Sequence, residues 1–462
     1  MRRPGGGGRA ADTRPVTATE PVDLTAADLT AADLHPALGD PALTSMNFLN
    51  EVSERYPAAV SLAAGRPYEE FFDVAAVHRH LDTFHRHLTD DLGHPPEQAR
   101  RLLLQYGRTK GIVHHLVARN LAVDEGITVD PEAVVVTVGC QEAMFLVLRA
   151  LRTGPTDVLL AVAPTYVGLT GAARLVDLPV WPVAGGPSGV DLADLSAQAR
   201  RARAAGLRPR ACYVMPDFAN PSGVSISAAD RRRLLTLAAE EDLLLLEDNP
   251  YGLFHVDDGR RPPTLKAVDT ERRVVYLGSF AKTVLPGARV GYVVADQRVA
   301  GPDGRIGPLA DQLAMIKSMV TVNTSPIAQA VIGGRLLEHG CSLIPANTRE
   351  RSAYTRNLRH LVTGLRRRFP AGTDGPAAVR WTVPAGGFFV VVTVPFPVDD
   401  ALLDRSARDY GVLWTPMAHF YDDTAPVCAL RLSVSAVTPA QIDVGLDRLA
   451  ALITDELAAR AS

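Results

Sequence analysis

A lysine follows closely on an apolar run that has the composition of a buried strand. Lys282 comes five residues after the run from Val274 to Leu277. Burying an ammonium group costs several kcal/mol unless the group is paired or deprotonated. A lysine with a lowered pKa supplies a neutral amine, which attacks carbonyl carbons and forms Schiff bases. The position of Lys282 therefore indicates nucleophilic chemistry on a carbonyl group.

A second apolar run leads through Gly139, Cys140 and Gln141 into a helical pattern. A turn of this kind offers free backbone N–H groups and the positive end of a helix dipole to a phosphate group. A strand-to-helix turn with a glycine also occurs in any doubly wound protein, so a purely structural turn is the alternative.

Two more apolar runs end in polar residues. One opens into a loop with Asn220, Pro221 and Gly223, in which the proline extends the backbone before it and the glycine permits a tight turn. The other ends in Asp248, with Tyr251 three residues later. A carboxylate there either caps the next element or faces a ligand cation.

The elements that position these residues are short runs, apolar on both faces, that alternate with helical patterns. The runs span residues 134–138, 158–162, 211–215, 243–246 and 274–277. They suit parallel strands buried between helices, and ligands of such sheets bind beyond the carboxyl ends of the strands. We predict helices at 142–152 and 228–242, the second capped by Ser225 or Ser227, and a long helical region over 306–337. The predicted fold is an α/β fold with a parallel-rich central sheet between helices, followed by a smaller domain.

Composition excludes several classes of protein. The chain has 462 residues, a net charge of −3 and 47% hydrophobic residues, which suits two or three domain-sized units. We expect no nucleic-acid or membrane partner, because no basic stretch and no apolar segment of about 18 residues is present. The four cysteines lie far apart and predict neither disulfides nor a metal site. This use of cysteine indicates a reducing setting, so we expect a cytoplasmic protein. The start of the chain lacks the apolar segment of a secretory signal.

The order of these motifs resembles the class I and II aminotransferases, which are pyridoxal-phosphate enzymes of fold type I. An Asn-Pro-x-Gly loop, an acidic strand end with a tyrosine three residues later, Ser279-x-x-Lys282 and then Arg289 occur in that order. The resemblance runs from about Asn47 to the C-terminus. We predict a disordered tail at 1–40, an N-terminal arm and part of the small domain at 41–90, a large cofactor-binding domain at 91–335 and a small α+β domain at 336–462.

The resemblance implies a role for each residue that matches a family motif. Lys282 would carry pyridoxal 5'-phosphate as a Schiff base and act as the general base. Asp248 would keep the pyridine nitrogen protonated, and Asn220 and Tyr251 would bind the phenolate oxygen. The remaining cofactor contacts would come from Ser279, Arg289, Gly139, Cys140 and Gln141 at the phosphate and from Tyr166 stacked on the ring.

The resemblance also implies substrate contacts and a partner subunit. Arg431 would fork onto the substrate α-carboxylate, and Gly65 would lie in a turn near the substrate. Arg66 would either read a distal acidic or phenolic group or be a solvated loop arginine. Tyr106 would reach the cofactor phosphate of a neighbouring subunit, which requires at least a homodimer.

Two positions depart from common members of the family. Cys140 stands where close relatives commonly have serine, so a hydroxyl donor to the phosphate is missing while the backbone N–H remains. Ala281 stands before the lysine where many members have serine. The first departure is expected to weaken cofactor binding without changing the reaction.

The function implied is transamination between an amino acid and a 2-oxo acid. The segments from Ser45 to Val52 and from Ser61 to Pro67 look like those of transaminases that make building blocks of peptide antibiotics, and 3,5-dihydroxyphenylglycine is the product we favour. Other cofactor-dependent chemistry is the alternative: decarboxylation, elimination or oxidation of an arginine-like substrate. A transcription regulator of the same fold would need a basic N-terminal winged helix, for which only about forty residues are available.

Overall fold

The chain is described by a computed structural model that covers residues 29–40, 43, 51, 54–186, 188–256, 261–370, 379–422 and 425–461. Residues 1–28 of the predicted tail and most of the segment from Ser45 to Val52 lie outside this set. Within the described ranges, no helix is both long enough and apolar enough to cross a membrane.

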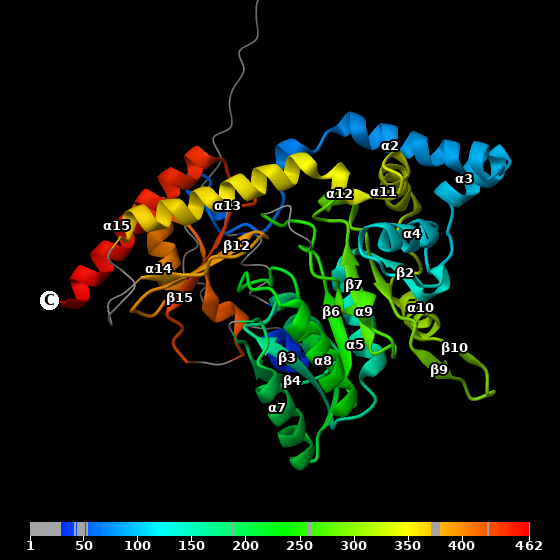
Figure 1. Ribbon diagram of the computed structural model, residues 1–462, viewed down its shortest axis with the longest axis horizontal. Coiled ribbons are helices and arrows are strands. Elements are labelled where there is room, and N and C mark those ends of the chain that lie inside the picture. Colours follow the sequence, from blue (N-terminus) through cyan, green and yellow to red (C-terminus); the bar gives the residue numbers. More distant parts are fainter. Residues whose placement is uncertain are drawn as a thin grey trace, which may run out of the picture.

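A seven-stranded sheet forms the centre of the larger part of the molecule (Figure 1). Its order is β2-β8-β7-β6-β5-β3-β4, and all neighbours are parallel except the two pairs made by β8. The predicted fold class is confirmed, and the five predicted runs correspond to β2, β3, β5, β6 and β7. The strands span Val134–Thr137 (β2), Asp157–Ala163 (β3), Val180–Ala184 (β4), Arg208–Val214 (β5), Leu244–Asp248 (β6), Val274–Ser279 (β7) and Gly291–Val294 (β8).

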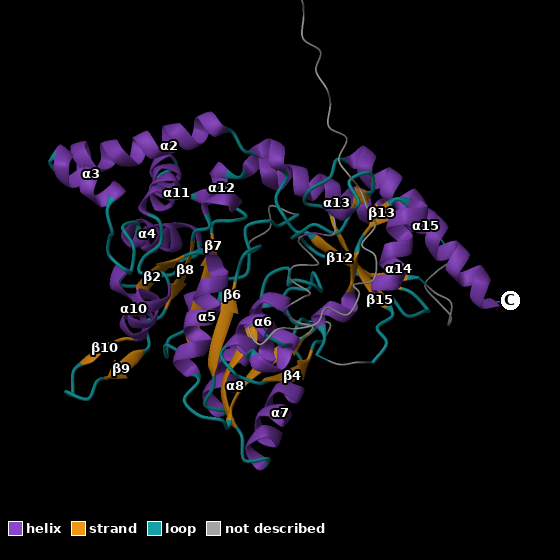
Figure 2. Ribbon diagram, turned by 180° about the vertical axis from the view of Figure 1, so that it is seen from behind, coloured by secondary structure: helices purple, strands orange, loops and turns teal. Residues whose placement is uncertain are grey.

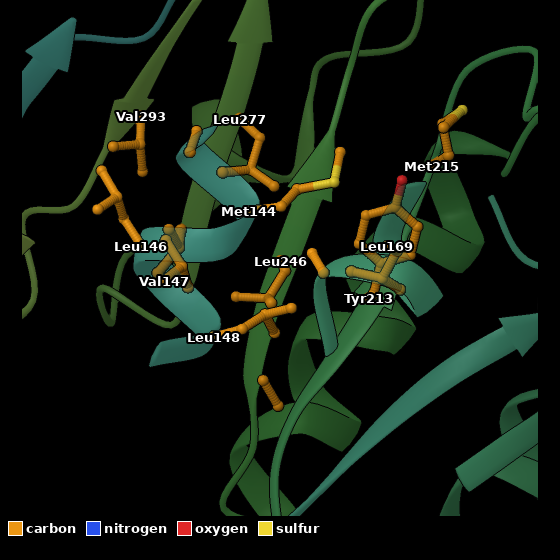
Figure 3. Close-up of a cluster of buried hydrophobic side chains, with 14 of the residues drawn as sticks. Met144, Leu146, Val147, Leu148, Leu169, Tyr213, Met215, Leu246, Leu277 and Val293 are labelled. Carbon is orange, nitrogen blue, oxygen red and sulfur yellow. The ribbon is translucent and has the colours of Figure 1, made fainter. Parts of the chain in front are cut away.

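Alternate strand residues face two layers of helices. On one face Leu246, Leu277 and Val293 pack against α5 (Gly139–Leu151), as Figure 3 shows. The same face carries α6 (Val167–Leu175) and α10 (Leu309–Val320). Because both faces are buried, polar groups are left to the strand ends. The opposite face is covered by α4 (His114–Asp124), α7 (Leu192–Ala204), α8 (Ala228–Glu240) and α11 (Pro326–Glu338).

One of the two predicted caps begins α8. The hydroxyl of Ser227 accepts the backbone N–H of Asp230 at 3.1 Å. Ser225 instead accepts the N–H of Phe218 at 3.0 Å, which braces the loop that carries Asn220. Both hydroxyls therefore stabilise local backbone, one at a helix and one at a site loop.

The region predicted to be helical over 306–337 begins with a strand and is broken once between two helices. The prediction is therefore wrong for residues 306–308 and 321–325. β10 (Ile306–Pro308) pairs with β9 (Arg298–Ala300) in a hairpin before α10 begins. Between α10 and α11, Val322 has a φ of +64°, which ends the helix. Pro326 then takes the first turn of α11, where no N–H is needed.

A four-stranded antiparallel sheet forms the centre of the smaller part. Its order is β11-β12-β15-β14, with strands at Arg380–Trp381, Phe389–Thr393, Ala429–Ser433 and Thr415–Pro416. Helices α13 (Thr348–Arg368) and α15 (Pro439–Ala461) lie side by side and pack on one face of this sheet, with α14 (Asp400–Arg405) nearby (Figure 2). The predicted small α+β domain corresponds to this sheet and these helices.

The N-terminal segments contribute to both parts. β1 (Val60–Ser61) pairs in parallel with β13 (Val412–Leu413) of the smaller part. α2 (Val74–Arg86) and α3 (Pro96–Leu104) pack instead against α11. The approach is so close that a Cβ on Gly334 would lie 1.8 Å from the carbonyl oxygen of His80. Within the predicted tail, residues 31–33 and 36–39 form short 3-10 helices. The predicted domain boundaries stay predictions.

Candidate active site

A cavity of about 270 Å³ lies where the carboxyl ends of the parallel strands meet the smaller part of the molecule. Every residue predicted for the site lines it except Gly139 and Tyr106. The predicted residues that do line it are Gly65, Arg66, Cys140, Gln141, Tyr166, Asn220, Asp248, Tyr251, Ser279, Lys282, Arg289 and Arg431.

Lys282 projects into this cavity from the turn after β7. Its Nζ donates a hydrogen bond of 2.9 Å to the carbonyl oxygen of Gly65. Burial lowers the pKa of Lys282 to about 8, with Arg289 and Arg431 adding to the effect and Asp248 opposing it. The amine is therefore neutral in a much larger fraction of molecules near neutral pH than an ordinary lysine.

Asp248 lies at the end of β6, and both of its oxygens accept hydrogen bonds. Tyr213 donates its hydroxyl to Oδ2 at 2.7 Å, and the thiol of Cys140 lies 3.6 Å from Oδ1. Burial raises the pKa of Asp248 to about 6, while the bonds from Tyr213 and Cys140 and the charge of Lys282 oppose the rise. The carboxylate is held in one orientation and faces the cavity.

The preceding carboxylate, Glu247, binds the start of a helix, whereas Asp248 faces the cavity. Successive strand residues point to opposite faces, so Glu247 points away from Asp248. It accepts the N–H groups of Leu265 and Lys266 at 2.8 and 2.7 Å, at the start of α9 (Leu265–Val268). Strand alternation thus leaves Asp248 for the cavity.

The turn between β2 and α5 forms a cradle for an anion. A Cβ on Gly139 would lie 2.4 Å from a guanidinium nitrogen of Arg289, so Arg289 lies directly over this glycine. Gly291 closes the other side, because a Cβ there would lie 2.6 Å from the backbone nitrogen of Cys140. Gly139 therefore lies beneath Arg289, just outside the set of residues that line the cavity. N–H groups at a helix start together with an arginine suit a phosphate.

Arg431 comes from β15 of the smaller part and is buried. It donates hydrogen bonds to the side-chain oxygen of Asn220 and, at 3.1 Å, to the carbonyl of Ala63. Its guanidinium carbon lies 4.2 Å from the ring centroid of Phe389 and 5.0 Å from that of Phe420. Burial lowers the pKa of Arg431 to about 10, so it remains a cation. Its Nε is buried and has no hydrogen-bond partner in the described part of the chain, which leaves a donor for a ligand.

Two tyrosines line the cavity and a third lies outside it. Tyr166 precedes α6 and Tyr251 follows β6, and burial raises the pKa of both phenols. Tyr251 packs against Phe389 with ring centroids 5.6 Å apart. Tyr106 follows α3 and its side chain is 85% exposed. The structure thus brings Tyr166 and Tyr251 to the site of their own chain and leaves Tyr106 on the surface.

Gly65 and Arg66 lie on the N-terminal side of the cavity. A Cβ on Gly65 would come within 2.9 Å of the Phe389 ring, so only glycine fits this close approach. Arg66 pairs with Glu69 at 3.3 Å, and both side chains are largely exposed. Arg66 therefore borders solvent at the edge of the cavity.

Comparison with known proteins identifies the family. The model of the aminotransferase class I and II family matches residues 85–449, which is most of the chain.

The chain belongs to the class I and II aminotransferases.

Relatives of this aminotransferase agree in sequence and in fold. The (S)-3,5-dihydroxyphenylglycine transaminase of Amycolatopsis orientalis is 57% identical over 421 residues, 91% of this chain and 94% of that protein. The kynurenine aminotransferase structure of Pyrococcus horikoshii, in complex with PMP, has a TM-score of 0.76 at 28% identity and covers 89% of this chain and 94% of that one. The α-aminoadipate aminotransferase of Thermus thermophilus, in complex with a phosphopyridoxyl-leucine, has a TM-score of 0.75 at 28% identity and covers 93% and 100%.

The aminotransferase is a pyridoxal-phosphate-dependent enzyme, and its cavity fits that cofactor. The cavity offers an amine for the aldehyde at Lys282, a carboxylate for a pyridinium N–H at Asp248 and a cationic cradle for the phosphate at Arg289. The buried and unpartnered Nε of Arg431 adds a donor for a carboxylate.

Several residues in or behind the aminotransferase cavity escape prediction from the sequence. Tyr213, which supports Asp248 from behind the cavity, lies inside an apolar strand run. A buried phenol hydroxyl needs a partner, and that need is a usable signal. Phe389 follows the glycines at 386 and 387, whose flexibility marks a special turn. Met144, Met215 and Phe420 carry no signal beyond their apolar character.

Proposed function

We propose that this aminotransferase transfers the amino group of an aromatic, non-proteinogenic amino acid, with (S)-3,5-dihydroxyphenylglycine as its leading substrate. The observation that carries the proposal is the 57% identity, over 91% of the chain, to the transaminase named for that amino acid. A role in the cytoplasmic synthesis of antibiotic building blocks goes with this substrate.

Pyridoxal phosphate, when bound, supplies an aldehyde that condenses with amines and a ring that accepts electrons. Lys282 would hold it covalently through Nζ. With the substrate amine in its place, the free Nζ of Lys282 would take the proton from the substrate α-carbon and pass it to the former aldehyde carbon of the cofactor. Lys282 would move a proton in the opposite direction when the 2-oxo acid accepts the amino group. The lowered pKa of Lys282, about 8, supports this role because a base must be neutral to accept a proton.

Asp248 would hold a proton on the ring nitrogen of the cofactor. A carboxylate in a buried site stabilises an adjacent cation strongly, because little water screens the pair. Tyr213 supports the role by keeping one oxygen of Asp248 bound at 2.7 Å. Tyr166 would stack on the ring, and Asn220 and Tyr251 would bind the phenolate oxygen. The phosphate would be held by Ser279, Arg289, Gly139 and the backbone of Cys140 and Gln141.

Arg431 would orient the substrate through its α-carboxylate. Two phenylalanine rings and fixed hydrogen bonds hold its planar guanidinium, which matches the two oxygens of a carboxylate. Gly65 would contact the substrate from the N-terminal side. Arg66, at the solvent edge, would donate to a phenolic hydroxyl of the substrate ring.

We also propose that the active unit is a homodimer with shared sites. Tyr106 is 85% exposed and Met319, at the end of α10, is likewise 85% exposed. Apolar surface of this kind is commonly covered by a partner. Asn323, in the loop after α10, lies against Gly107, so the two exposed side chains belong to neighbouring segments. Tyr106 would then reach the phosphate in the partner subunit.

The test is a donor and acceptor screen with the purified holoenzyme. (S)-3,5-dihydroxyphenylglycine, 4-hydroxyphenylglycine and phenylglycine are offered as donors with a panel of 2-oxo acids, and products are quantified by mass spectrometry. We expect equal amounts of new amino acid and new 2-oxo acid, with the dihydroxylated donor preferred by about tenfold or more in kcat/KM. Equal use of the three donors removes the substrate proposal. Release of CO2 or uptake of O2 without amino transfer removes transamination.

A further inference from the structure

An ion pair is buried directly behind the turn that forms the anion cradle. Lys317 of α10 donates from Nζ to Oε2 of Glu142 in the first turns of α5, at 2.8 Å. The lysine side chain is 0% exposed and the glutamate side chain 7% exposed. Neither residue lines the cavity, so neither touches the reacting groups.

The remaining partners of Glu142 tie the carboxylate to the start of α5. Oε2 also accepts the backbone N–H of Val138 at 2.6 Å, and Oε1 accepts the hydroxyl of Thr321 at 2.6 Å. Lys317 donates in addition to the Thr321 hydroxyl at 2.8 Å. The carboxylate therefore lies beside the residue that precedes Gly139.

This location puts two anions at one helix end. The N-terminus of α5 stabilises negative charge, and the cofactor phosphate and Glu142 would both use it. Two like charges this close repel strongly in a buried setting. The ammonium group of Lys317 neutralises the adjacent carboxylate of Glu142 and so removes its repulsion of the phosphate.

Stability alone is a poor reason for such a pair. A buried ion pair can commonly be replaced by apolar residues without loss of stability, because desolvation of the two charges offsets their attraction. The pair does, however, give the turn from Val138 to Gly139 a fixed shape at no net charge. A neutral, rigid support is what a site for a dianion requires.

We propose that Lys317 is a positioning residue for the cofactor: it neutralises Glu142 and so permits the phosphate to bind at the start of α5. The inference rests on the proposed location of the phosphate beside Arg289, Gly139 and Cys140. It assigns no contact with substrate to Lys317 and no part in proton transfer.

The experiment compares two probes, pyridoxal phosphate and pyridoxal, which lacks the phosphate. Their dissociation constants are measured by absorbance with the apoenzymes of the wild type, Lys317→Met, Glu142→Gln and the double variant. Lys317→Met is expected to raise the dissociation constant of pyridoxal phosphate by about tenfold or more and that of pyridoxal by less than about twofold. The double variant is expected to restore the wild-type ratio of the two dissociation constants, because it removes both charges.

Lys266→Met is the matched control. Lys266 is also buried and pairs with Asp269 and Asp296, at the opposite end of β7 from Ser279. This variant is expected to lower stability without changing the ratio of the two constants.

Arg289→Ala tests the location of the phosphate separately. If this variant does not lower affinity for pyridoxal phosphate selectively, the proposed phosphate site itself is wrong, and not only the role of Lys317.

An unchanged ratio in Lys317→Met, with Arg289→Ala selective as expected, overturns the inference. If Lys317→Met does not fold, Glu142→Gln decides. Removing only the negative charge is expected to tighten binding of pyridoxal phosphate relative to pyridoxal. If the ratio of the two dissociation constants in Glu142→Gln equals that of the wild type, the inference is also overturned.

Discussion

The hydroxyl of Tyr213 donates a 2.7 Å hydrogen bond to Oδ2 of Asp248 from the adjacent parallel strand. The two side chains lie on the same face of the sheet, because Tyr213 is in register with Leu246 and Asp248 is two residues further along. Cys140 approaches the other oxygen of the carboxylate, at 3.6 Å. The orientation of Asp248 thus depends on two residues outside its own strand.

Tyr213→Phe is expected to raise the pKa of Asp248 above its present value of about 6, because the hydrogen bond from Tyr213 opposes the effect of burial. Loss of a hydrogen bond to a charged group costs about 1.5–3 kcal/mol, so kcat should fall about tenfold to a hundredfold. The acidic limb of the pH–rate profile should move to higher pH. Tyr276→Phe, a similarly buried tyrosine on β7, should leave that limb in place. An unmoved limb in Tyr213→Phe would contradict the role.

Capture of pyridoxal phosphate by the apoenzyme should become faster as the pH rises and level off above about 8, where Lys282 has lost its proton. Stopped-flow absorbance measures the rate, and borohydride reduction followed by peptide mapping locates the label. Lys282→Arg stays charged and should show no capture, with kcat lower by at least about 10²–10⁴-fold. A flat rate between about pH 6 and 8, or a label on another lysine, refutes the assignment.

Arg431→Lys keeps the positive charge but loses the planar fork that matches a carboxylate. We expect kcat/KM for the amino acid to fall by about ten- to a hundredfold, mainly through KM, while the affinity for the cofactor stays unchanged. An amine substrate without the α-carboxylate provides the control, since its turnover should be insensitive to the substitution. Equal losses with both substrates would mean that Arg431 acts on something other than the carboxylate.

Mixing two defective variants tests the shared site. Tyr106→Ala should retain pyridoxal phosphate poorly, and Lys282→Ala should be inactive. In a mixed dimer, one site would combine Lys282 from the first variant with Tyr106 from the second. Activity at limiting cofactor should therefore exceed that of either variant alone. Light scattering should give the mass of two chains, and a mixture with no gain in activity would exclude a Tyr106 contribution in trans.

His115 should make the enzyme sensitive to acid. Burial lowers the pKa of His115 to about 4, and the nearby His114 and His87 add to the effect. The unfolded chain therefore binds a proton at this residue first, so the stability it contributes is present above about pH 6.5 and is lost as the pH falls toward 4. In urea unfolding, His115→Leu should reduce the loss in free energy of unfolding between about pH 6.5 and 4 by about 1–2 kcal/mol. His85→Gln, on an exposed face, serves as the control; the same slope in all three proteins would disprove the effect.

Most of the central sheet could be predicted because burial on both faces leaves a plain apolar signature in β2, β3, β5, β6 and β7. β8 escaped although it is as long as β2, with which it pairs in antiparallel fashion. It follows β7 after a connection too short to hold a crossover helix, so no alternation of strand and helix announces it. Gly291 at the start of β8 and Arg289 just before it lie at the cradle, a closeness that no local pattern encodes.

The site residues with distinctive chemistry, such as Lys282 and Asp248, could be predicted from their places at strand ends. The structure shows that Asp248 faces the cavity and that the preceding Glu247 does not, because successive side chains of a strand point to opposite faces. Pairs formed over long sequence separations, such as Tyr213 with Asp248 or Lys317 with Glu142, leave no mark in the sequence because each partner alone looks like an isolated polar residue in an apolar segment.

The cavity takes Gly65, Lys282 and Arg431 from three stretches of chain that are far apart in sequence. During translation the strands around Lys282 leave the ribosome long before Arg431, and domains generally fold in the order of synthesis. The nascent enzyme can thus build its lysine-bearing sheet early, but the pocket that selects an amino acid is complete only when nearly the whole polypeptide has been made.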